Sequence, residues 1–208
     1  MSYVAVIDTG INNLRSIIGA INHSGYKTIV TNDEEKIMNS SALILPGVGS
    51  FPAGMKKLKK ANLDVIITRC FKKKKPILAI CLGFQMLFSS SNEFKFTKGL
   101  NFLNGEVKSL KSLNTKKIIP NLGWSYIKSK KNKKNYLFEK INTDMPIYFI
   151  HSYYVEIHDK KYITSYINFG GKKVATSIQY ENLYGVQFHP EKSGYNGLKI
   201  VKNFLDKI

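Results

Sequence analysis

The stretch Pro76-Ile77-Leu78-Ala79-Ile80-Cys81-Leu82-Gly83-Phe84-Gln85-Met86-Leu87-Phe88 decides the fold class of this 208-residue chain. Its first five residues form a short apolar run after four lysines, which predicts a buried strand over Pro76–Ile80. The residues from Leu82 to Phe88 form an apolar stretch that predicts a helix. Cys81 lies at the sharp turn between the two. This is the layout of a nucleophile elbow, in which small neighbours let the nucleophile project from the tip of the turn.

The same alternation of strands and helices fills the first half of the chain. The predicted strands are Tyr3–Ile7, Lys27–Thr31 and Ala42–Leu45, and the predicted helices are Asn12–His23, Phe51–Lys60 and Leu63–Lys75. This βαβα rhythm predicts an α/β fold with a mostly parallel central sheet and flanking helices on both faces.

From about Gly105 onward the pattern changes to short alternating segments, which predict an antiparallel extension of the same core. The predicted strands there are Gly105–Leu110, Lys116–Ile119, Trp124–Lys128, Ile147–Ile150, Ile163–Ile167 and Lys173–Gln179. A closing helix is predicted over Gly197–Ile208, and a flexible loop over Ser129–Asn135. Neither a repeat nor a second domain is visible, so residues 1–208 are expected to form a single domain.

Composition limits the class of protein. Hydrophobic residues make up 43% of the chain, which is typical of a globular protein, and no run of 18 apolar residues predicts a membrane span. The N-terminus lacks the pattern of a signal peptide. The two cysteines, Cys70 and Cys81, stand in different contexts, which favours reduced thiols and a cytoplasmic location.

The net charge of +18 raises the question of nucleic-acid binding. Lys and Arg together number 32, yet only Arg15 and Arg69 are arginines, the residue that base and phosphate recognition favours. The lysines occur in runs along the whole chain. We therefore interpret the charge as a solvated surface and keep a nucleic-acid-binding module as the weaker alternative.

Cys81 is the candidate nucleophile. The N–H groups and the positive dipole end of the following helix would stabilise a thiolate there, and the same N–H groups can bind an oxyanion. The alternative is that Cys81 is a small buried apolar residue, as free cysteines usually are. Cys70, inside a predicted helix with no polar motif around it, is assigned that role.

The run Gly185-Val186-Gln187-Phe188-His189-Pro190-Glu191 supplies a candidate base and its orienting carboxylate. In a strand, His189 and Glu191 would point to the same side, so that Glu191 bonds one ring nitrogen while the other faces the thiol. A surface pair at a strand end is the alternative. No cluster of Cys and His has metal-ligand spacing, so no metal site is expected.

Two further segments carry groups suited to binding. Leu45-Pro46-Gly47-Val48-Gly49-Ser50-Phe51 follows a predicted strand, and its glycines would let the backbone approach a ligand and turn an N–H toward negative charge. Phe149-Ile150-His151-Ser152-Tyr153-Tyr154 ends a strand with a group of polar side chains. Taken alone, these segments also fit a tight turn and an ordinary strand edge.

Taken together, these motifs resemble those of class I glutamine amidotransferases, and more narrowly those of the glutaminase subunits of imidazole glycerol phosphate synthases. The resemblance covers essentially the whole chain. It rests on segments that match in order: Asp8 to Ser16, Pro46 to Gly49, Cys81 to Gln85, Pro120 to Trp124, His151 to Tyr154 and Gln187 to Gly194.

The resemblance implies a Cys81–His189–Glu191 triad that hydrolyses glutamine through a glutamyl thioester, without a cofactor. It implies oxyanion donors from the backbone of Val48, Gly49 and Leu82. It also implies that the residues matching the glutamine-holding positions are Gln85, Ser152 and Tyr153.

By the same resemblance, the partner is a (βα)8-barrel cyclase subunit, which activates the glutaminase and receives the ammonia to make imidazole glycerol phosphate and AICAR in histidine biosynthesis. Trp124 and Lys192 match positions at the interface of the heterodimer.

The chain departs from the family pattern at Ala79, in the opening loop at Ile11, and at Asn121-Leu122 before Gly123-Trp124. These departures leave open a paralogous subunit that supplies ammonia for an amidino-sugar pathway. A standalone thiol γ-glutamyl hydrolase would share the triad without needing Trp124.

Overall fold

The computed structural model describes residues 2–10, 14–130, 135–141 and 146–208. Five parallel strands form the centre of an eight-stranded sheet, in the order β2-β1-β3-β4-β14. Their bounds are Val4–Ile7 (β1), Thr28–Thr31 (β2), Ala42–Leu45 (β3), Ile77–Ile80 (β4) and Leu183–Val186 (β14). Every residue of β1, β3, β4 and β14 is buried, as in a sheet covered on both faces.

Three antiparallel strands extend this sheet beyond β14, in the order β13 (Lys172–Tyr180), β12 (Ile163–Phe169) and β9 (Lys128–Ser129). A second sheet holds β11 (Tyr153–Ile157), β7 (Leu103–Ser109), β5 (Phe88–Ser91) and β6 (Thr97–Lys98). A separate antiparallel pair is formed by β8 (Asn121–Ser125) and β10 (Ile147–His151). The expected α/β fold, with a mostly parallel sheet and an antiparallel extension, is confirmed.

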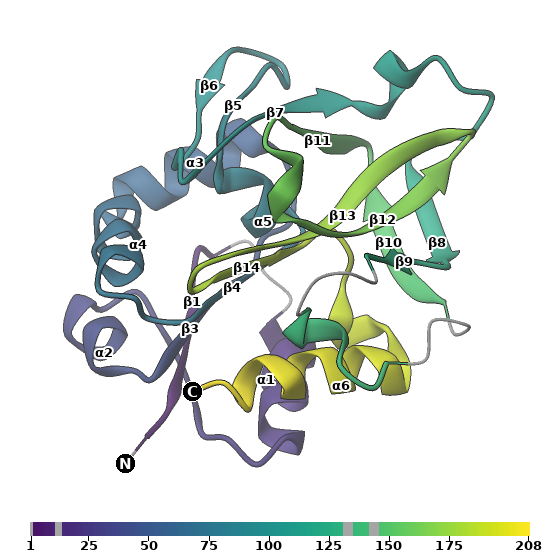
Figure 1. Ribbon diagram of the computed structural model, residues 1–208. Helices are drawn as coiled ribbons and strands as arrows, with labels where there is room; N and C mark the ends of the chain where they lie inside the picture. The colour runs from purple at the N-terminus through teal and green to yellow at the C-terminus, as the bar shows by residue number, and fades with distance from the viewer. Residues whose placement is uncertain (1, 11–13, 131–134, 142–145) are drawn as a thin grey trace.

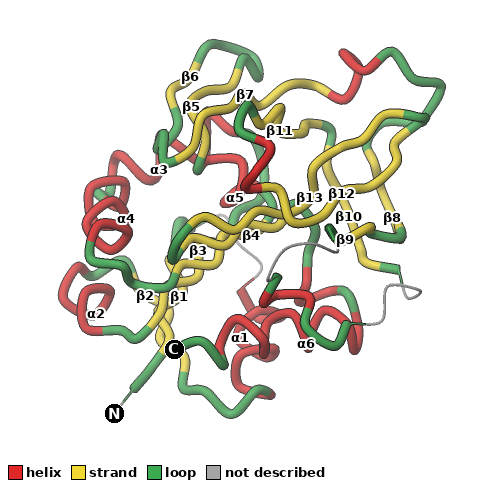
Figure 2. Tube along the Cα trace, viewed as in Figure 1, coloured by secondary structure: helices red, strands yellow, loops and turns green. Residues whose placement is uncertain are grey.

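Helices cover both faces of the central sheet (Figures 1 and 2). On one face lie α1 (Leu14–His23) and α6 (Gly194–Leu205); on the other lie α2 (Glu34–Asn39), α3 (Phe51–Lys60) and α4 (Leu63–Lys72), with the short α5 (Leu82–Met86). Alternation along β1 explains the two cores: Val4 and Val6 pack toward α1 and α6, whereas Ala5 and Ile7 pack toward α3 and α4. Within the described residues there are also four single-turn 3-10 helices: η1 (Leu110–Leu113), η2 (Tyr136–Phe138), η3 (Lys160–Tyr162) and η4 (Pro190–Lys192).

Several predicted elements were wrong in type or extent. Lys116–Ile119 is not a strand: Ile118 is 86% exposed, and no described strand pairs with the segment. The strand predicted over Trp124–Lys128 is divided between β8 and β9, because the chain leaves β10 after Ser125 and joins β12 at Lys128.

The helix predicted over Leu82–Phe88 is only five residues long, because Phe88 begins β5 and pairs with Leu103 of β7. The helix predicted over Leu63–Lys75 ends at Lys72, and the closing helix runs over Gly194–Leu205. Helix α2 was missed, although Asp33 is a recognisable N-cap, accepting from the backbone N–H of Lys36 at 2.9 Å. The start predicted at Asn12 for the first helix, and most of the loop predicted over Ser129–Asn135, lie outside the described residues.

Candidate active site

Cys81 is the single residue between β4 and α5, and its backbone is strained, with φ of 54° and ψ of −109°. Positive φ is uncommon outside glycine, and such strain clusters at functional sites. The backbone N–H of Cys81 donates to the carbonyl of Val186 at 2.8 Å, which ties the turn to β14. The packing behind it is tight, since a Cβ on Gly83 would lie 2.0 Å from the carbonyl oxygen of Leu45. The strand–turn–helix geometry expected around Cys81 is therefore observed.

His189 and Glu191 form a buried pair, with Nδ1 of His189 2.7 Å from Oε1 of Glu191. The reason expected for their proximity was wrong. Strand β14 ends at Val186, and the tight turn of η4, rather than strand alternation, brings the carboxylate to the ring. Because β4 and β14 are adjacent and parallel, the residues that follow them meet at one edge of the sheet.

The loop that carries His189 is fastened to β10. The backbone N–H of His189 donates to the carbonyl of Tyr148 at 3.0 Å. The hydroxyl of Ser193 donates to the carbonyl of His189 at 2.6 Å and accepts from the N–H of Tyr148 at 3.0 Å. These bonds hold the imidazole in place relative to the cavity.

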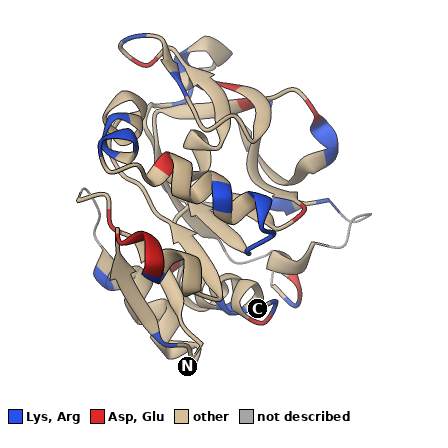
Figure 3. Cartoon of the chain, turned by 90° about the vertical axis from the view of Figure 1, so that its left-hand side faces the viewer, with Lys and Arg blue, Asp and Glu red and all other residues tan. Residues whose placement is uncertain are grey.

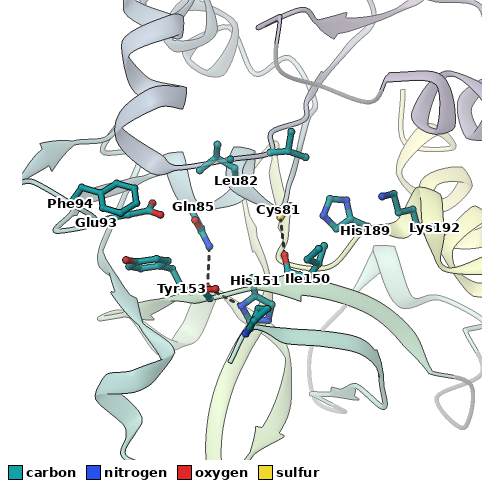
Figure 4. A pocket seen from close by; sticks show the side chains of 14 residues that line it. Cys81, Leu82, Gln85, Glu93, Phe94, Ile150, His151, Tyr153, His189 and Lys192 are labelled. Atoms are coloured by element: carbon teal, nitrogen blue, oxygen red, sulfur yellow. Dashed lines mark hydrogen bonds between the residues drawn. The ribbon is translucent and has the colours of Figure 1, made fainter. Parts of the chain in front are cut away.

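Neighbouring charges determine the protonation of His189. Burial lowers its pKa, but the side chains of Cys81 and Glu191 outweigh burial and raise the pKa to about 10. Atom Nε2 of His189 is buried and makes no hydrogen bond within the described residues, and Figure 4 shows the ring beside Cys81. The arrangement suits an imidazolium held between a thiolate and a carboxylate.

A cavity of about 500 Å³ opens over the cysteine. Most of the residues predicted for the site line it: Val48, Gly49, Cys81, Leu82, Gln85, Ser152, Tyr153, His189 and Lys192. Glu191 lies behind His189 and Trp124 lies outside, at a neighbouring depression. The volume falls in the range of small-molecule sites.

Gln85 presents its amide oxygen to the cavity. Its Nε2 donates to the carbonyl of Tyr153 at 3.1 Å and to Oε1 of Gln187 at 3.0 Å. Both N–H groups are therefore used, and Gln85 can meet a ligand only as a hydrogen-bond acceptor.

Two titratable residues of this cavity, Glu93 and His151, were not predicted as site residues, although His151 lies in a segment recognised as polar. Glu93 is 8% exposed, its Oε2 accepts from the N–H of Phe51 at 2.7 Å, and burial raises its pKa more than that bond lowers it. No sequence pattern marks it, because it is a lone acidic residue after a serine-rich segment. Its carboxylate gives the cavity a group that can bind a cation.

His151 is held as a neutral ring. Its Nδ1 lies 2.8 Å from the carbonyl of Tyr153, which can only accept, so Nε2 is the nitrogen that accepts from Nδ2 of Asn121 at 2.9 Å. Burial lowers the pKa of His151 to about 4; the Tyr153 carbonyl opposes this, and the nearby His189 adds to it. The ring thus carries no charge at neutral pH.

One of the predicted oxyanion donors is occupied. The N–H of Leu82 donates to the carbonyl of Gly47 at 3.3 Å, while Val48 and Gly49 line the cavity above it. The loop approaches α5 so closely that a Cβ on Gly47 would lie 2.8 Å from the backbone nitrogen of Gly83. Leu82 can serve as a donor only after the Gly47 carbonyl has moved.

Helix α5, which begins directly after Cys81, is only five residues long. The helix dipole acts mainly within the first turn, so stabilisation of a thiolate by this helix start stays a prediction.

An exposed apolar strip borders the mouth of the cavity. Trp124 is 56% exposed and packs edge-on against Tyr148, with ring centroids 5.7 Å apart. The ammonium of Lys192 lies 6.0 Å from the centroid of the same Tyr148 ring. Other exposed apolar residues of the strip are Ile118, Leu122, Tyr126 and Ile150. Apolar strips of this kind are typical of protein–protein interfaces.

Basic residues are spread over several separate elements of the face drawn in Figure 3, with acidic residues among them. Within the described ranges, every helix falls short of the length and apolarity that a membrane crossing needs. In the same part of the chain, no three His, Cys, Asp or Glu side chains gather in a way that could hold a metal ion.

Comparison with known proteins defines the family. The model of the glutamine amidotransferase class-I family matches residues 5–208. Among solved structures, "Structure of PurLQS from Thermotoga maritima" superposes with a TM-score of 0.76 at 18% identity, covering 99% of this chain and 98% of that one. A second, "Crystal structure of glutamine amidotransferase", superposes with a TM-score of 0.75 at 14% identity and the same coverage. At these identities the likeness concerns the fold alone.

Curated relatives are more similar in sequence. "Imidazole glycerol phosphate synthase subunit HisH 2" of Vibrio vulnificus is 42% identical over 98% of this chain and 94% of its own length. The protein of the same name from Methanococcus maripaludis is 42% identical over 97% of this chain and 98% of its own length. The HisH subunit of Bacillus cereus is 39% identical over 97% and 93%. The chain belongs to the class-I glutamine amidotransferase family and, within it, to the HisH subunits of imidazole glycerol phosphate synthase.

Proposed function

We propose that this chain hydrolyses glutamine to glutamate and ammonia, as the glutaminase subunit of an imidazole glycerol phosphate synthase in histidine biosynthesis. The observation that carries the proposal is that the strained Cys81 shares one cavity with His189, which Glu191 bonds from behind. The names of the relatives supply the pathway, and the family supplies the reaction class.

The first half of the reaction forms a thioester. The thiolate of Cys81 attacks the side-chain carbonyl carbon of glutamine, giving a tetrahedral oxyanion. His189, protonated through its ion pair with the thiolate and Glu191, then gives a proton to the departing amine. Ammonia leaves, and the glutamyl group remains on sulfur.

The second half restores the enzyme. Now neutral, His189 takes a proton from water, which attacks the thioester carbonyl. The second oxyanion collapses, glutamate leaves, and the thiolate returns. Glu191 keeps the tautomer of His189 constant throughout.

The cavity offers complementary groups for the rest of the substrate. The Glu93 carboxylate and the Gln85 oxygen are acceptors suited to the α-ammonium group of glutamine. Ser152 and Tyr153, which also line the cavity, are the remaining residues proposed to hold its backbone groups.

The occupied Leu82 N–H supports the proposal that a partner activates the chain. Removing one oxyanion donor typically lowers turnover about 10²–10³-fold, so the isolated chain should be slow. We propose that a (βα)8-barrel cyclase subunit docks on the strip around Trp124 and Lys192 as a heterodimer. Its bound ribonucleotide would then favour the loop conformation that frees Leu82 and turns Val48 and Gly49 toward the oxyanion, and the ammonia would pass into the barrel.

The test is glutamate release from glutamine by the purified chain, alone and with the cyclase barrel plus its ribonucleotide. We expect turnover only in the full mixture, and none from Cys81→Ser or Cys81→Ala, with circular dichroism unchanged. Normal turnover in either variant would refute the assignment of the nucleophile.

Two other outcomes identify the alternatives. Fast hydrolysis by the chain alone would indicate a standalone thiol γ-glutamyl hydrolase. If a folded chain releases no glutamate in the full mixture, the result would indicate the paralogous subunit of an amidino-sugar pathway, which works with a different barrel.

A further inference from the structure

Gln187 lies in the middle of the motif that supplies His189, and the mechanism above leaves it without a role. Its side chain is fully buried, with 0% exposed, directly after β14. Its backbone N–H donates to the carbonyl of Thr176 at 2.8 Å, which fixes the residue against β13. A buried amide beside a reactive thiol calls for a chemical reason.

The orientation of the Gln187 amide is determined by its neighbours. Gln85 donates through Nε2 to Oε1 of Gln187 at 3.0 Å. Gln85 cannot be reversed, because the same Nε2 also donates to the carbonyl of Tyr153 at 3.1 Å. That carbonyl in turn receives Nδ1–H of His151 at 2.8 Å. The oxygen of Gln187 therefore faces Gln85, and its nitrogen faces away.

The group that the nitrogen faces is the nucleophile. Nε2 of Gln187 lies 3.9 Å from Sγ of Cys81 and donates to it. The other described contact of Sγ is the carbonyl of Ile150 at 4.0 Å, which accepts from a thiol but repels a thiolate. Among the described contacts of Sγ, apart from the imidazole of His189, the Nε2–H of Gln187 is thus the donor that stabilises a thiolate relative to a thiol.

We propose that Gln187 is a further catalytic residue, whose amide N–H, oriented by Gln85, stabilises the Cys81 thiolate as nucleophile and as leaving group. A neutral amide donates to negative sulfur more strongly than to a neutral thioether or thioester sulfur. It does so without exchanging a proton, so it leaves the proton of His189 for the amine. When the thioester breaks, the sulfur becomes a thiolate again, and the same N–H stabilises its negative charge by donating a hydrogen bond.

The effect on turnover rests on the proposed glutaminase function, whereas the effect on the thiol does not. A purely structural Gln187 would stabilise the fold and leave the titration of Cys81 unchanged. The ionisation of Cys81 is therefore the deciding measurement. Other titratable groups around the thiol come from several elements and are unchanged by substitution at position 187: Glu93, His151, Tyr153, His189, Glu191 and Lys192.

The experiment measures the alkylation rate of Cys81 by iodoacetamide against pH in the full chain, with mass spectrometry to separate Cys81 from Cys70. Gln187→Met keeps the length and removes the donor; Gln187→Glu keeps the shape and places an acceptor there. We expect the midpoint to rise by about one pH unit in Gln187→Met, and further in Gln187→Glu. The matched control is Gln179→Met, in β13, which should match the unsubstituted chain.

Glutamate release with the cyclase barrel and its ribonucleotide is measured on the same variants. Loss of a hydrogen bond to a charged group predicts about a tenfold fall in kcat for Gln187→Met, with KM within about twofold. A midpoint unchanged in a folded Gln187→Met or Gln187→Glu chain would overturn the proposal. A shifted midpoint in a chain that releases no glutamate with this barrel would support the Gln187 contact and refute the proposed role in histidine biosynthesis instead.

Discussion

Two buried histidines in the site are held in opposite charge states by their surroundings. His189 lies against Cys81 and Glu191, whose side chains keep its proton. His151 lies between the Asn121 amide and the Tyr153 carbonyl, neither of which compensates a positive charge fully. We therefore propose His189 as the acid–base group, whereas His151 is a neutral ring that makes structural hydrogen bonds.

This difference predicts a pH dependence of stability. His151 has an ordinary pKa of 6.5 and a folded value of about 4. Above about pH 6.5 neither the folded nor the unfolded state protonates it, so stability is fully present. As pH falls from 6.5 to 4, the unfolded chain binds a proton that the folded chain does not, and up to about 3 kcal/mol of the free energy of unfolding is lost.

Urea unfolding between pH 4 and pH 7 tests this prediction. His151→Gln should lose less stability over this range than the unsubstituted chain, whereas the exposed His23→Gln should behave like it. His189 affects stability at higher pH. Because its pKa is raised in the folded chain, it adds stability that is fully present below pH 6.5 and is lost as pH rises toward 10. Equal pH slopes for His151→Gln and the unsubstituted chain would contradict the charge state given to His151.

At the scale of elements, the position of Glu191 depends on how closely α6 packs against η4. Gly197 is buried in α6, and a Cβ there would lie 1.8 Å from the carbonyl oxygen of Pro190. Pro190 stands between His189 and Glu191, so any shift at this contact moves the pair. The absence of a side chain at Gly197 therefore helps to position the His189–Glu191 pair.

Gly197→Ala should therefore destabilise the chain by about 1–3 kcal/mol through overpacking and lower glutaminase turnover as well. Gly19→Ala is the control, because a Cβ on Gly19 of α1 meets nothing within 4 Å. Replacing an unhindered helical glycine should raise stability by about 0.5–1 kcal/mol. Urea unfolding measures both variants, and equal stability changes would show that the contact with Pro190 is unimportant.

At the scale of the whole molecule, the cavity and the exposed apolar strip share one side. Pro120, Ile150 and Lys192 line the cavity, and Leu122 and Trp124 extend from its rim. A partner seated on the strip would cover the cavity mouth and lie next to the Gly47–Gly49 loop. Docking would then place the partner where its bound ribonucleotide can act on this loop.

Trp124→Ala should weaken assembly with the proposed cyclase barrel by about 30-fold or more, as for a central aromatic in an interface. Because Trp124 is 56% exposed, the free energy of unfolding of the isolated chain should change by less than about 1 kcal/mol. Titration calorimetry measures the affinity. Val65→Ala, an exposed apolar site on α4, is the control, and equal affinities for the two variants would remove Trp124 from the interface.

Local pattern was sufficient for much of the fold. The apolar runs of β1, β3 and β4 and the helices α3 and α4 were predicted to within a few residues, because each pattern depends on nearby residues only. Prediction failed where distant pairing outweighed local preference. Phe88 lies in an apolar run typical of a helix, yet it begins β5, which pairs with β7. The strand that contains Gly185 ends at Val186, and η4 follows a few residues later.

The sequence alone determined the α/β class, the elbow at Cys81, and the residue types of the proposed triad, because these depend on short-range patterns and side-chain chemistry. Only the tertiary structure decided that Leu82 donates to Gly47, that Glu93 enters the cavity, and that Gln187 points its N–H at sulfur. Such contacts join residues that are far apart in the chain or differ by small rotations of the backbone. No periodicity in the sequence records them.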